Sequence, residues 1–150
     1  MKRIPAKVRS DRLWQDVYQL VESMYDIVYS LVDEYPDEQW TTASRLRSAA
    51  NDSIFYVSQA VGSAKIDASQ YDWNSARKSL FTLQSMYTFA AKQQFFKLEP
   101  ELVVKIDELI SLVDIRLDEG VKEEAIQRKK ELEPWLEKYR IWQEIEKITP

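Results

Sequence analysis

Four basic residues are the positions in this sequence with the clearest potential for binding chemistry: Arg45, Arg47, Arg77 and Lys78. A guanidinium group contacts phosphate through paired hydrogen bonds, so a surface built from these residues could bind nucleic acid or an acidic protein. The alternative, which we favour, is that each arginine pairs with a carboxylate on an adjacent helix or subunit. The four residues are therefore candidate contacts for nucleic acid or for a partner.

A second candidate site lies near the C-terminus, where Trp135, Tyr139, Trp142 and Ile145 follow Pro134 at helical spacing. The simpler interpretation, which we favour, is that this stripe packs on the rest of the chain. The other is that the terminal amphipathic segment docks on another subunit or on a partner protein, as a helix does in an apolar groove. Both interpretations remain open at the level of the sequence.

Catalytic and metal chemistry is poorly provided for, because the chain contains neither cysteine nor histidine. The absence of cysteine excludes disulfides, thiolate metal sites and cysteine nucleophiles. The absence of histidine removes the commonest general base and the commonest transition-metal ligand. Acidic residues such as Asp16, Glu22 and Asp26 fall mostly on the outer face of a helix and are interpreted as solvated. We expect no enzymatic activity, no cofactor and no metal.

The composition predicts the elements that must position these residues. A chain of 150 residues suits one domain, and 45% hydrophobic with 31% charged residues and only 2 glycines favours long regular helices. Apolar residues recur three and four positions apart. The expected fold is all-α: a basic arm at 1–12, an antiparallel up-down-up-down four-helix bundle at 13–118, and a helical extension at 119–150 that is kinked or broken near Pro134.

Helix ends are indicated by capping residues, proline and glycine. Ser10 or Asp11 can cap the first helix, Tyr35-Pro36 ends it, and Asp37 and Glu38 suit the start of the second. Gly62 should end the second helix, and Asp67 with Gln70 forms a capping box for the third, which should run to about Phe96. Pro100 should open the fourth, which should end before Asp118-Glu119-Gly120.

The inner face of each predicted helix follows from the same spacing. The first helix should bury its leucine, valine and methionine stripe, and the second should bury an unusually small face that lets a neighbouring backbone approach closely. The predicted inner positions are Leu13, Val17, Leu20, Met24, Ile27, Leu31; Trp40, Ala43, Leu46 or Arg47, Ala50, Ile54, Val57, Val61; Trp73, Ala76, Leu80, Leu83, Tyr87, Ala90; and Leu102, Ile106, Leu109, Val113, Leu117.

Charge is unevenly distributed along the chain. Residues 1–97 hold 12 basic and 11 acidic side chains, whereas residues 98–150 hold 9 and 14. An acidic C-terminal third makes the whole chain a poor general binder of nucleic acid. The first residues are basic, with Lys2, Arg3, Lys7, Arg9 and Arg12, and no apolar run like that of a signal peptide follows them. No apolar stretch of the chain approaches the length of a membrane span. We expect a cytoplasmic protein with no membrane partner.

Four short motifs are landmarks of residues 13–117: Leu13-Trp14-Gln15, Tyr35-Pro36, the Arg-Leu-Arg-Ser-Ala-Ala run at 45–50 and the Ala-Arg-Lys-Ser-Leu run at 76–80. With these landmarks the range resembles the four-helix-bundle proteins encoded in ribosomal-RNA intervening sequences, and more distantly the accessory variability determinant of diversity-generating retroelements. Residues 56–60 read Tyr-Val-Ser-Gln-Ala where the family usually has Asn-Ile-Ala-Glu-Gly. The tail from Val121 onward lies outside the resemblance.

The resemblance implies a homo-oligomer, commonly a pentameric barrel, without an established enzymatic activity. In the retroelement branch it also implies a basic assembly that binds a reverse transcriptase and nucleic acid. Two functions follow as hypotheses. The first is a non-enzymatic homo-oligomeric scaffold that associates through its small-residue and aromatic faces and binds a protein partner. The alternative is a nucleic-acid-binding accessory protein, for example to a reverse transcriptase, that uses a basic patch repeated in the oligomer.

Overall fold

The computed structural model describes residues 4–34 and 40–149, and within these ranges every regular element is a helix. The predicted all-α class is therefore confirmed. The elements are α1 (Ala6–Arg9), α2 (Arg12–Glu34), α3 (Trp40–Gly62), α4 (Ile66–Lys92) and α5 (Pro100–Ile148).

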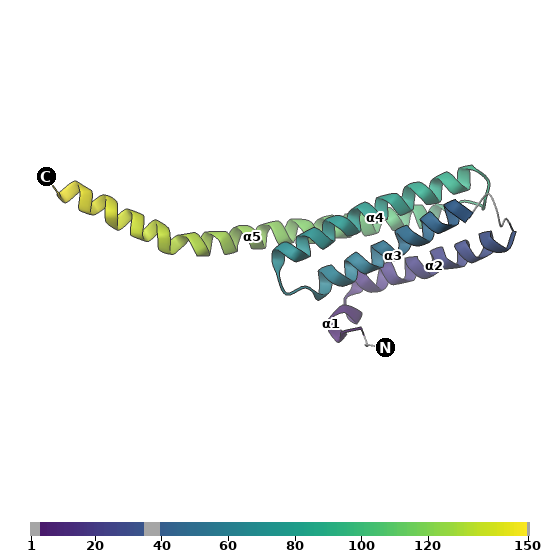
Figure 1. Cartoon of the computed structure of the whole chain (residues 1–150), viewed down its shortest axis with the longest axis horizontal. Coiled ribbons are helices and arrows are strands. Elements are labelled where there is room, and N and C mark those ends of the chain that lie inside the picture. Colours follow the sequence, from purple (N-terminus) through teal and green to yellow (C-terminus); the bar gives the residue numbers. More distant parts are fainter. Residues whose placement is uncertain (1–3, 35–39, 150) are drawn as a thin grey trace.

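Four long helices pack side by side, as Figure 1 shows for α2, α3, α4 and the first half of α5. The largest contacts are between α3 and α4, between α2 and α3, and between α4 and α5, while α5 also touches α2. The second half of α5 projects away from the other helices and carries the C-terminus (Figure 1). The packed part and the projecting part of α5 therefore need separate explanations.

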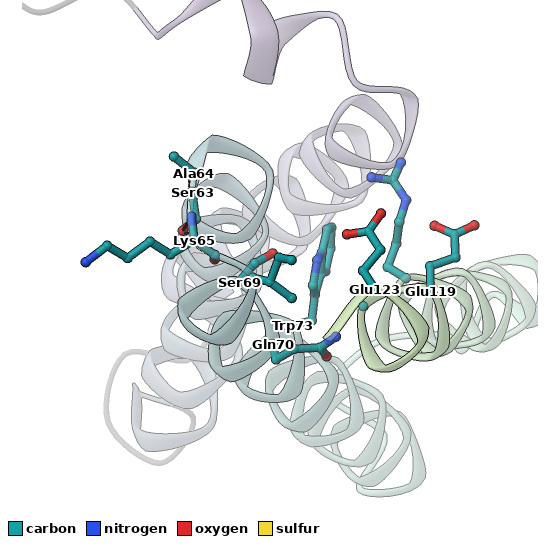
Figure 2. Close-up of a pocket in the computed structure, with 11 residues that line it drawn as sticks. Ser63, Ala64, Lys65, Ser69, Gln70, Trp73, Glu119 and Glu123 are labelled. Carbon is teal, nitrogen blue, oxygen red and sulfur yellow. Dashed lines mark hydrogen bonds between the residues drawn. The ribbon is translucent and has the colours of Figure 1, made fainter. Parts of the chain in front are cut away.

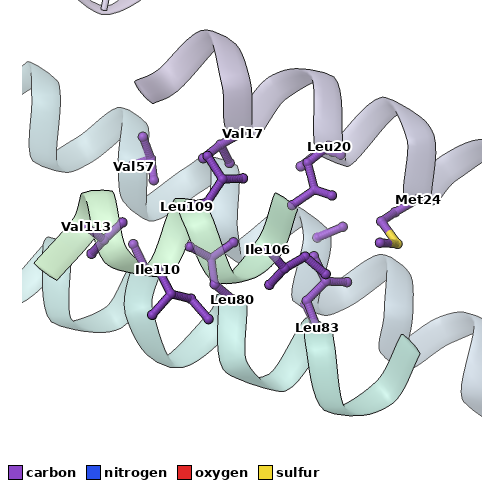
Figure 3. Packing of buried hydrophobic residues seen from close by; sticks show 14 of the residues in the cluster. Val17, Leu20, Met24, Val57, Leu80, Leu83, Ile106, Leu109, Ile110 and Val113 are labelled. Carbon is purple, nitrogen blue, oxygen red and sulfur yellow. The ribbon is translucent and has the colours of Figure 1, made fainter. Parts of the chain in front are cut away.

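The packed part holds one continuous apolar core drawn from all five helices. Figure 3 shows its centre, where Val17 and Leu20 of α2 meet Leu80 of α4 and Leu109 of α5. Most predicted inner positions are buried, and Ile27, Ile54, Leu102 and Leu117 are partly buried against the core. The sequence left open whether Leu46 or Arg47 faces the core; Leu46 is buried and Arg47 is exposed. The Trp40 side chain lies outside the described residues.

The small face of α3 is used inside the chain. Ala43, Ala49, Ala50 and Ala60 are all buried, and so is Ser53, whose hydroxyl donates a hydrogen bond to the Ala49 carbonyl at 2.8 Å. Small side chains let α3 approach both α2 and α4 closely, which explains its extensive contacts with each. The chain's own helices cover this face, so it is not exposed for the self-association that the sequence suggested for it.

Capping explains several helix ends. The Asp11 carboxylate accepts a hydrogen bond from the Trp14 backbone N–H at 3.1 Å, so Asp11 caps α2, while the Ser10 hydroxyl donates instead to the Lys7 carbonyl. α3 ends at Gly62 and α5 begins at Pro100, as predicted. The predicted signals at Tyr35-Pro36, Asp37 and Glu38 lie outside the described residues.

The third long helix departs from the prediction at both ends. α4 begins at Ile66 after Lys65, without a side-chain cap, so the Asp67 and Gln70 capping box is wrong. It also ends at Lys92, before the predicted Phe96. Gln94 adopts a left-handed conformation with φ of 63°, and the Phe95 N–H then bonds back to the Ala90 carbonyl at 3.1 Å. This geometry terminates a helix, although Gln has no special preference for it.

The predicted boundary at residues 118–120 is not a helix end, because α5 runs through it without interruption. Gly120 is instead a contact point: the Gln70 side-chain amide occupies the space that a Cβ atom would fill there. The same amide donates to the Leu117 carbonyl at 3.2 Å. α5 also continues through Pro134, so the helix is not broken there, and Figure 1 shows it curving in its second half.

The range predicted as a basic arm contains α1. Val8 of this short helix is 3% exposed and faces Gly62, where an added Cβ would lie 3.5 Å from a Val8 methyl group. Lys7, Arg9 and Arg12 are exposed. Lys2 and Arg3 lie outside the described residues. Part of the arm is therefore anchored in the core.

Candidate interaction site

The four predicted basic residues do not form one patch. Arg45 and Lys78 both line a shallow groove between α3 and α4, with a volume of about 410 Å³. Asp52 lines the same groove, one acidic group beside the two basic ones. This is the part of the prediction that the structure brings together.

Arg77, next in sequence to Lys78, is directed elsewhere. Its guanidinium donates to the Asp114 carboxylate of α5 at 2.6 Å and lies over the Phe81 ring, 4.8 Å from the ring centroid. Both partners hold Arg77 against its own bundle, which is the pairing role that we favoured for the arginines. Because the pair is about two-fifths exposed, it contributes little to stability.

Arg47 lies on a different side of α3 from Arg45. Positions 47, 51 and 58 recur at helical spacing, and Asn51 and Ser58 accept hydrogen bonds from Tyr25 and Trp14 of α2. The exposed Arg47 therefore lies toward the α2 side of α3, whereas Arg45 lies toward α4. Two residues apart on a helix point in opposed directions, so Arg45 and Arg47 cannot serve one short ligand together.

A second concave region, not predicted from the sequence, lies where the α3 to α4 connection meets α5. Figure 2 shows Gln70 and Trp73 of α4 on one side and Glu119 and Glu123 of α5 on the other. Its volume is about 240 Å³. No sequence motif predicts this concave region, because residues 63–73 and 116–123, which line it, are more than 40 positions apart in the sequence.

Arg116 is the charged group that organises this region. Its guanidinium donates to the Asp11 carboxylate at 3.0 Å and lies 5.5 Å from the centre of the Trp73 ring. Since Asp11 also caps α2, one arginine of α5 ties together α2 and α4. Ser69 and Gln70 donate to the backbone carbonyls of Ala60 and Leu117, so the polar groups of this region mainly join helices of the bundle.

Within residues 4–31 and 41–149, two ionisable side chains have pKa values that depart from their ordinary values. Burial raises the pKa of the Tyr87 phenol, whose oxygen accepts a hydrogen bond from the Glu99 backbone N–H at 2.8 Å. Burial also raises the pKa of the Asp72 carboxyl. The Glu99 carboxylate also raises the pKa of Tyr87, and the Tyr87 oxygen acts as a buried acceptor just before the start of α5.

The tail, defined here as residues 121–149 of α5, is exposed along its whole length except for the half-buried Glu124. Trp135 is 69% exposed, and Tyr139, Trp142 and Ile145 are each more than half exposed. The favoured interpretation, that this stripe packs on the chain's own bundle, is therefore wrong. The structure keeps the stripe in solvent because α5 carries it beyond the ends of the other helices (Figure 1).

Aromatic contacts within the tail hold its side chains in a defined arrangement. The Tyr139 and Trp142 rings are stacked with centroids 6.2 Å apart, and the Lys138 ammonium lies over the Trp135 ring at 5.2 Å. These contacts are local and leave most of each ring exposed. Large apolar side chains exposed along one helix are typical of a surface that binds another molecule.

The described part of the chain contains no cluster of three or more acidic side chains placed to hold a metal ion. In the same ranges, no helix combines the length and the apolar character needed to cross a lipid bilayer. Comparison of the chain with protein-family models, with curated proteins and with solved structures finds no match.

Proposed function

We propose that this protein is a non-enzymatic, homo-oligomeric helix-bundle scaffold that binds a protein partner. The observation that carries the proposal is the tail, whose large apolar side chains are exposed from Val121 to Ile148. Exposed apolar surface of this extent costs free energy in water, and burying it in an interface recovers that cost. A helix that packs only on its own bundle would be expected to carry polar side chains where it projects into solvent.

The proposal includes a specific architecture: an up-down-up-down bundle whose fourth helix continues into the tail and is kinked at Pro134. Helices adjacent in sequence contact each other, and the connections at 63–65 and 93–99 are short, which favours antiparallel neighbours. Pro134 lacks the N–H that would bond to the carbonyl four residues earlier, which favours a bend at this point. The bundle then acts as the body from which the tail projects.

The resemblance to the intervening-sequence bundles supports self-association and favours a pentamer. The resemblance extends only to residue 117, so the tail is an additional element beside any assembly that the bundle forms. The small face of α3 is buried within the chain, which directs attention to the tail as the associating surface. A partner protein would bind the assembled body or the apolar stripe.

The alternative of a nucleic-acid accessory has weaker support. Of the four basic residues proposed to contact phosphate, Arg77 is paired with Asp114 and Arg47 lies away from the groove that Arg45 and Lys78 share. The remaining pair lies beside Asp52. Binding by so few cations would be weak at physiological salt, because affinity grows with the number of phosphates neutralised.

Light scattering on the purified chain tests this proposal, at low and high salt and with and without a short DNA duplex. We expect one discrete oligomer that tolerates salt and does not bind the duplex. Trp142→Asp should lower the mass, whereas the matched control Ile141→Asp should not, because Ile141 is equally exposed but lies off the stripe. A full chain that is monomeric at every concentration would refute the scaffold. A salt-sensitive complex with the duplex that Arg45→Glu abolishes would favour the alternative.

A further inference from the structure

The stripe on the tail has a regular spacing. Arg128, Leu132, Trp135, Tyr139, Trp142 and Glu146 are separated by four, three, four, three and four residues. This alternation keeps all six on one side of a helix and is the spacing by which two helices pack along a common seam. Pro134 lies off this side, one residue before Trp135, so its ring does not obstruct the seam.

The six positions are also symmetric about residue 137. Residues 128 and 146, 132 and 142, and 135 and 139 are equally distant from that centre. If a second copy of the tail ran antiparallel with the same centre, Trp135 would meet Tyr139, and Leu132 would meet Trp142. Such a pairing is two-fold symmetric, so each contact would occur twice.

Charge distinguishes the two possible orientations of a second copy. In the antiparallel arrangement Arg128 of each copy lies opposite Glu146 of the other, so the apolar seam is closed by an ion pair at each end. In a parallel arrangement Arg128 would face Arg128 and Glu146 would face Glu146, which repel. The tail as a whole holds seven basic and seven acidic side chains, so two tails carry no net repulsion.

The size of the seam is adequate for association. Trp135, Tyr139 and Trp142 are each more than half exposed, and side chains of this type bury roughly 150–250 Å² when fully covered. Three such residues from each of two copies would cover several hundred Å², and Leu132, Leu136 and Ile145 would add to that area. The sum approaches the lower end of stable interfaces, which is about 1,200 Å².

We propose that the tail binds the tail of a second copy of this chain, antiparallel and centred on residue 137. The inference rests on the proposed self-association and names a surface and a geometry for it. A two-fold contact closes at two copies, so the tails would join two chains whether or not the bundles also form a pentamer. One contact is unfavourable: the flanking Lys138 would approach Lys138 of the second copy. Its ammonium lies over the Trp135 ring of its own chain, 5.2 Å from the ring centroid, so the charge has a cation–π partner within the tail.

Single cysteines test the orientation, because the natural chain has none. Residues 131, 138 and 145 each lie one position before a seam residue and form one flank of the stripe. In an antiparallel pair this flank faces the same flank of the second copy and is centred on residue 138, one residue beyond the centre of the seam. Lys138 therefore meets its own copy, and Glu131 meets Ile145. Lys138→Cys should therefore form a covalent dimer under mild oxidation of the full chain. Glu131→Cys alone should not, but a mixture of Glu131→Cys and Ile145→Cys chains should. These sites are exposed, so the substitutions leave the core intact.

Charge reversal tests the register independently by sedimentation or light scattering. Arg128→Glu or Glu146→Arg alone should weaken association about tenfold, and the double exchange should restore it, because opposite charges again face each other. Circular dichroism checks that each variant remains helical. In a parallel pair neither single change would weaken association, and that result would overturn the proposal.

The outcomes separate this inference from the proposed function. An oligomer that persists unchanged in the charge variants, with no Lys138→Cys dimer, would overturn the tail pairing and leave the scaffold intact. A full chain that is monomeric at all concentrations would overturn the self-association and the tail pairing together. Weakening by each charge variant, its restoration by the double exchange and the Lys138→Cys dimer would support both.

Discussion

Among single residues, Tyr87 combines an apolar and a polar role that the sequence does not reveal. The side chain is fully buried and its ring stacks on Phe96 with centroids 5.1 Å apart. Its oxygen also accepts the backbone N–H of Glu99, just before α5 begins. A position expected only to fill the core therefore also fixes where α5 starts.

Tyr87→Phe should lower the free energy of unfolding by about 1 kcal/mol at neutral pH, because the Glu99 N–H loses its acceptor. Burial raises the pKa of Tyr87 above its ordinary 10.0, so the folded state retains this proton when the unfolded chain loses it. Its contribution is complete below pH 10 and falls as the pH rises further. Urea unfolding from pH 8 to 11 should show a smaller alkaline loss in the variant. An unchanged pH dependence would contradict this role.

Gly120 and Gln70 make a second residue-scale pair. Glycine within a helix costs about 1 kcal/mol relative to alanine, but a Cβ at position 120 would displace the Gln70 amide from its bond to the Leu117 carbonyl. Gly120→Ala should therefore be nearly neutral in the natural chain. In a Gln70→Ala background it should stabilise by about 1 kcal/mol. Denaturant unfolding of the four chains measures this coupling, and equal effects in both backgrounds would refute the contact.

Among the elements, α5 has two parts with different roles. Its first half contributes Ile106, Leu109, Ile110 and Val113 to the core, whereas its second half contributes no buried residue. The same helix type thus serves as a wall of the bundle and as an exposed surface. What changes along α5 is the presence of neighbouring helices, since apolar residues recur at helical spacing both from Leu102 to Val121 and from Leu132 to Trp142.

Removal of residues 121–150 should accordingly change the stability of the bundle by less than about 1 kcal/mol, since no buried apolar contact is lost. If the tail mediates self-association, the thermal midpoint of the full chain should rise with protein concentration, and that of the shortened chain should not. Thermal unfolding at several concentrations measures both. A large loss of stability at concentrations where the full chain is monomeric would show that the tail supports the bundle directly.

At the scale of the molecule, the acidic excess and the candidate basic residues lie on different helices. The acidic excess of residues 98–150 lies in α5, whereas the groove formed by Arg45 and Lys78 lies between α3 and α4. Within α5 the tail is balanced, so the excess comes from residues 98–120, where Asp114 and Asp107 contact α4 through Arg77 and Gln84. Part of the acidic charge therefore holds helices together, and the balanced tail is suited to association.

The sequence alone determined the all-α class, the start of α2, the end of α3, the start of α5 and most of the core. Helical periodicity is a local property, so the inner faces of α2, α3 and α4 could be predicted from the spacing of residues such as Leu20, Val57 and Leu80. Pro100 and Gly62 act through local backbone restrictions, so the start of α5 and the end of α3 could also be predicted.

The tertiary structure decided the features that depend on distant neighbours. Gly120 has the properties of a helix end, but Gln70, 50 positions away, makes it a packing contact inside α5. Arg77 is one of four candidate contacts in the sequence, and only the position of Asp114 on α5 decides that it pairs within the bundle. The stripe around Trp135 has the same periodicity as a core face, and only the length of α5 relative to its neighbours leaves it exposed, because burial depends on which surfaces are within reach.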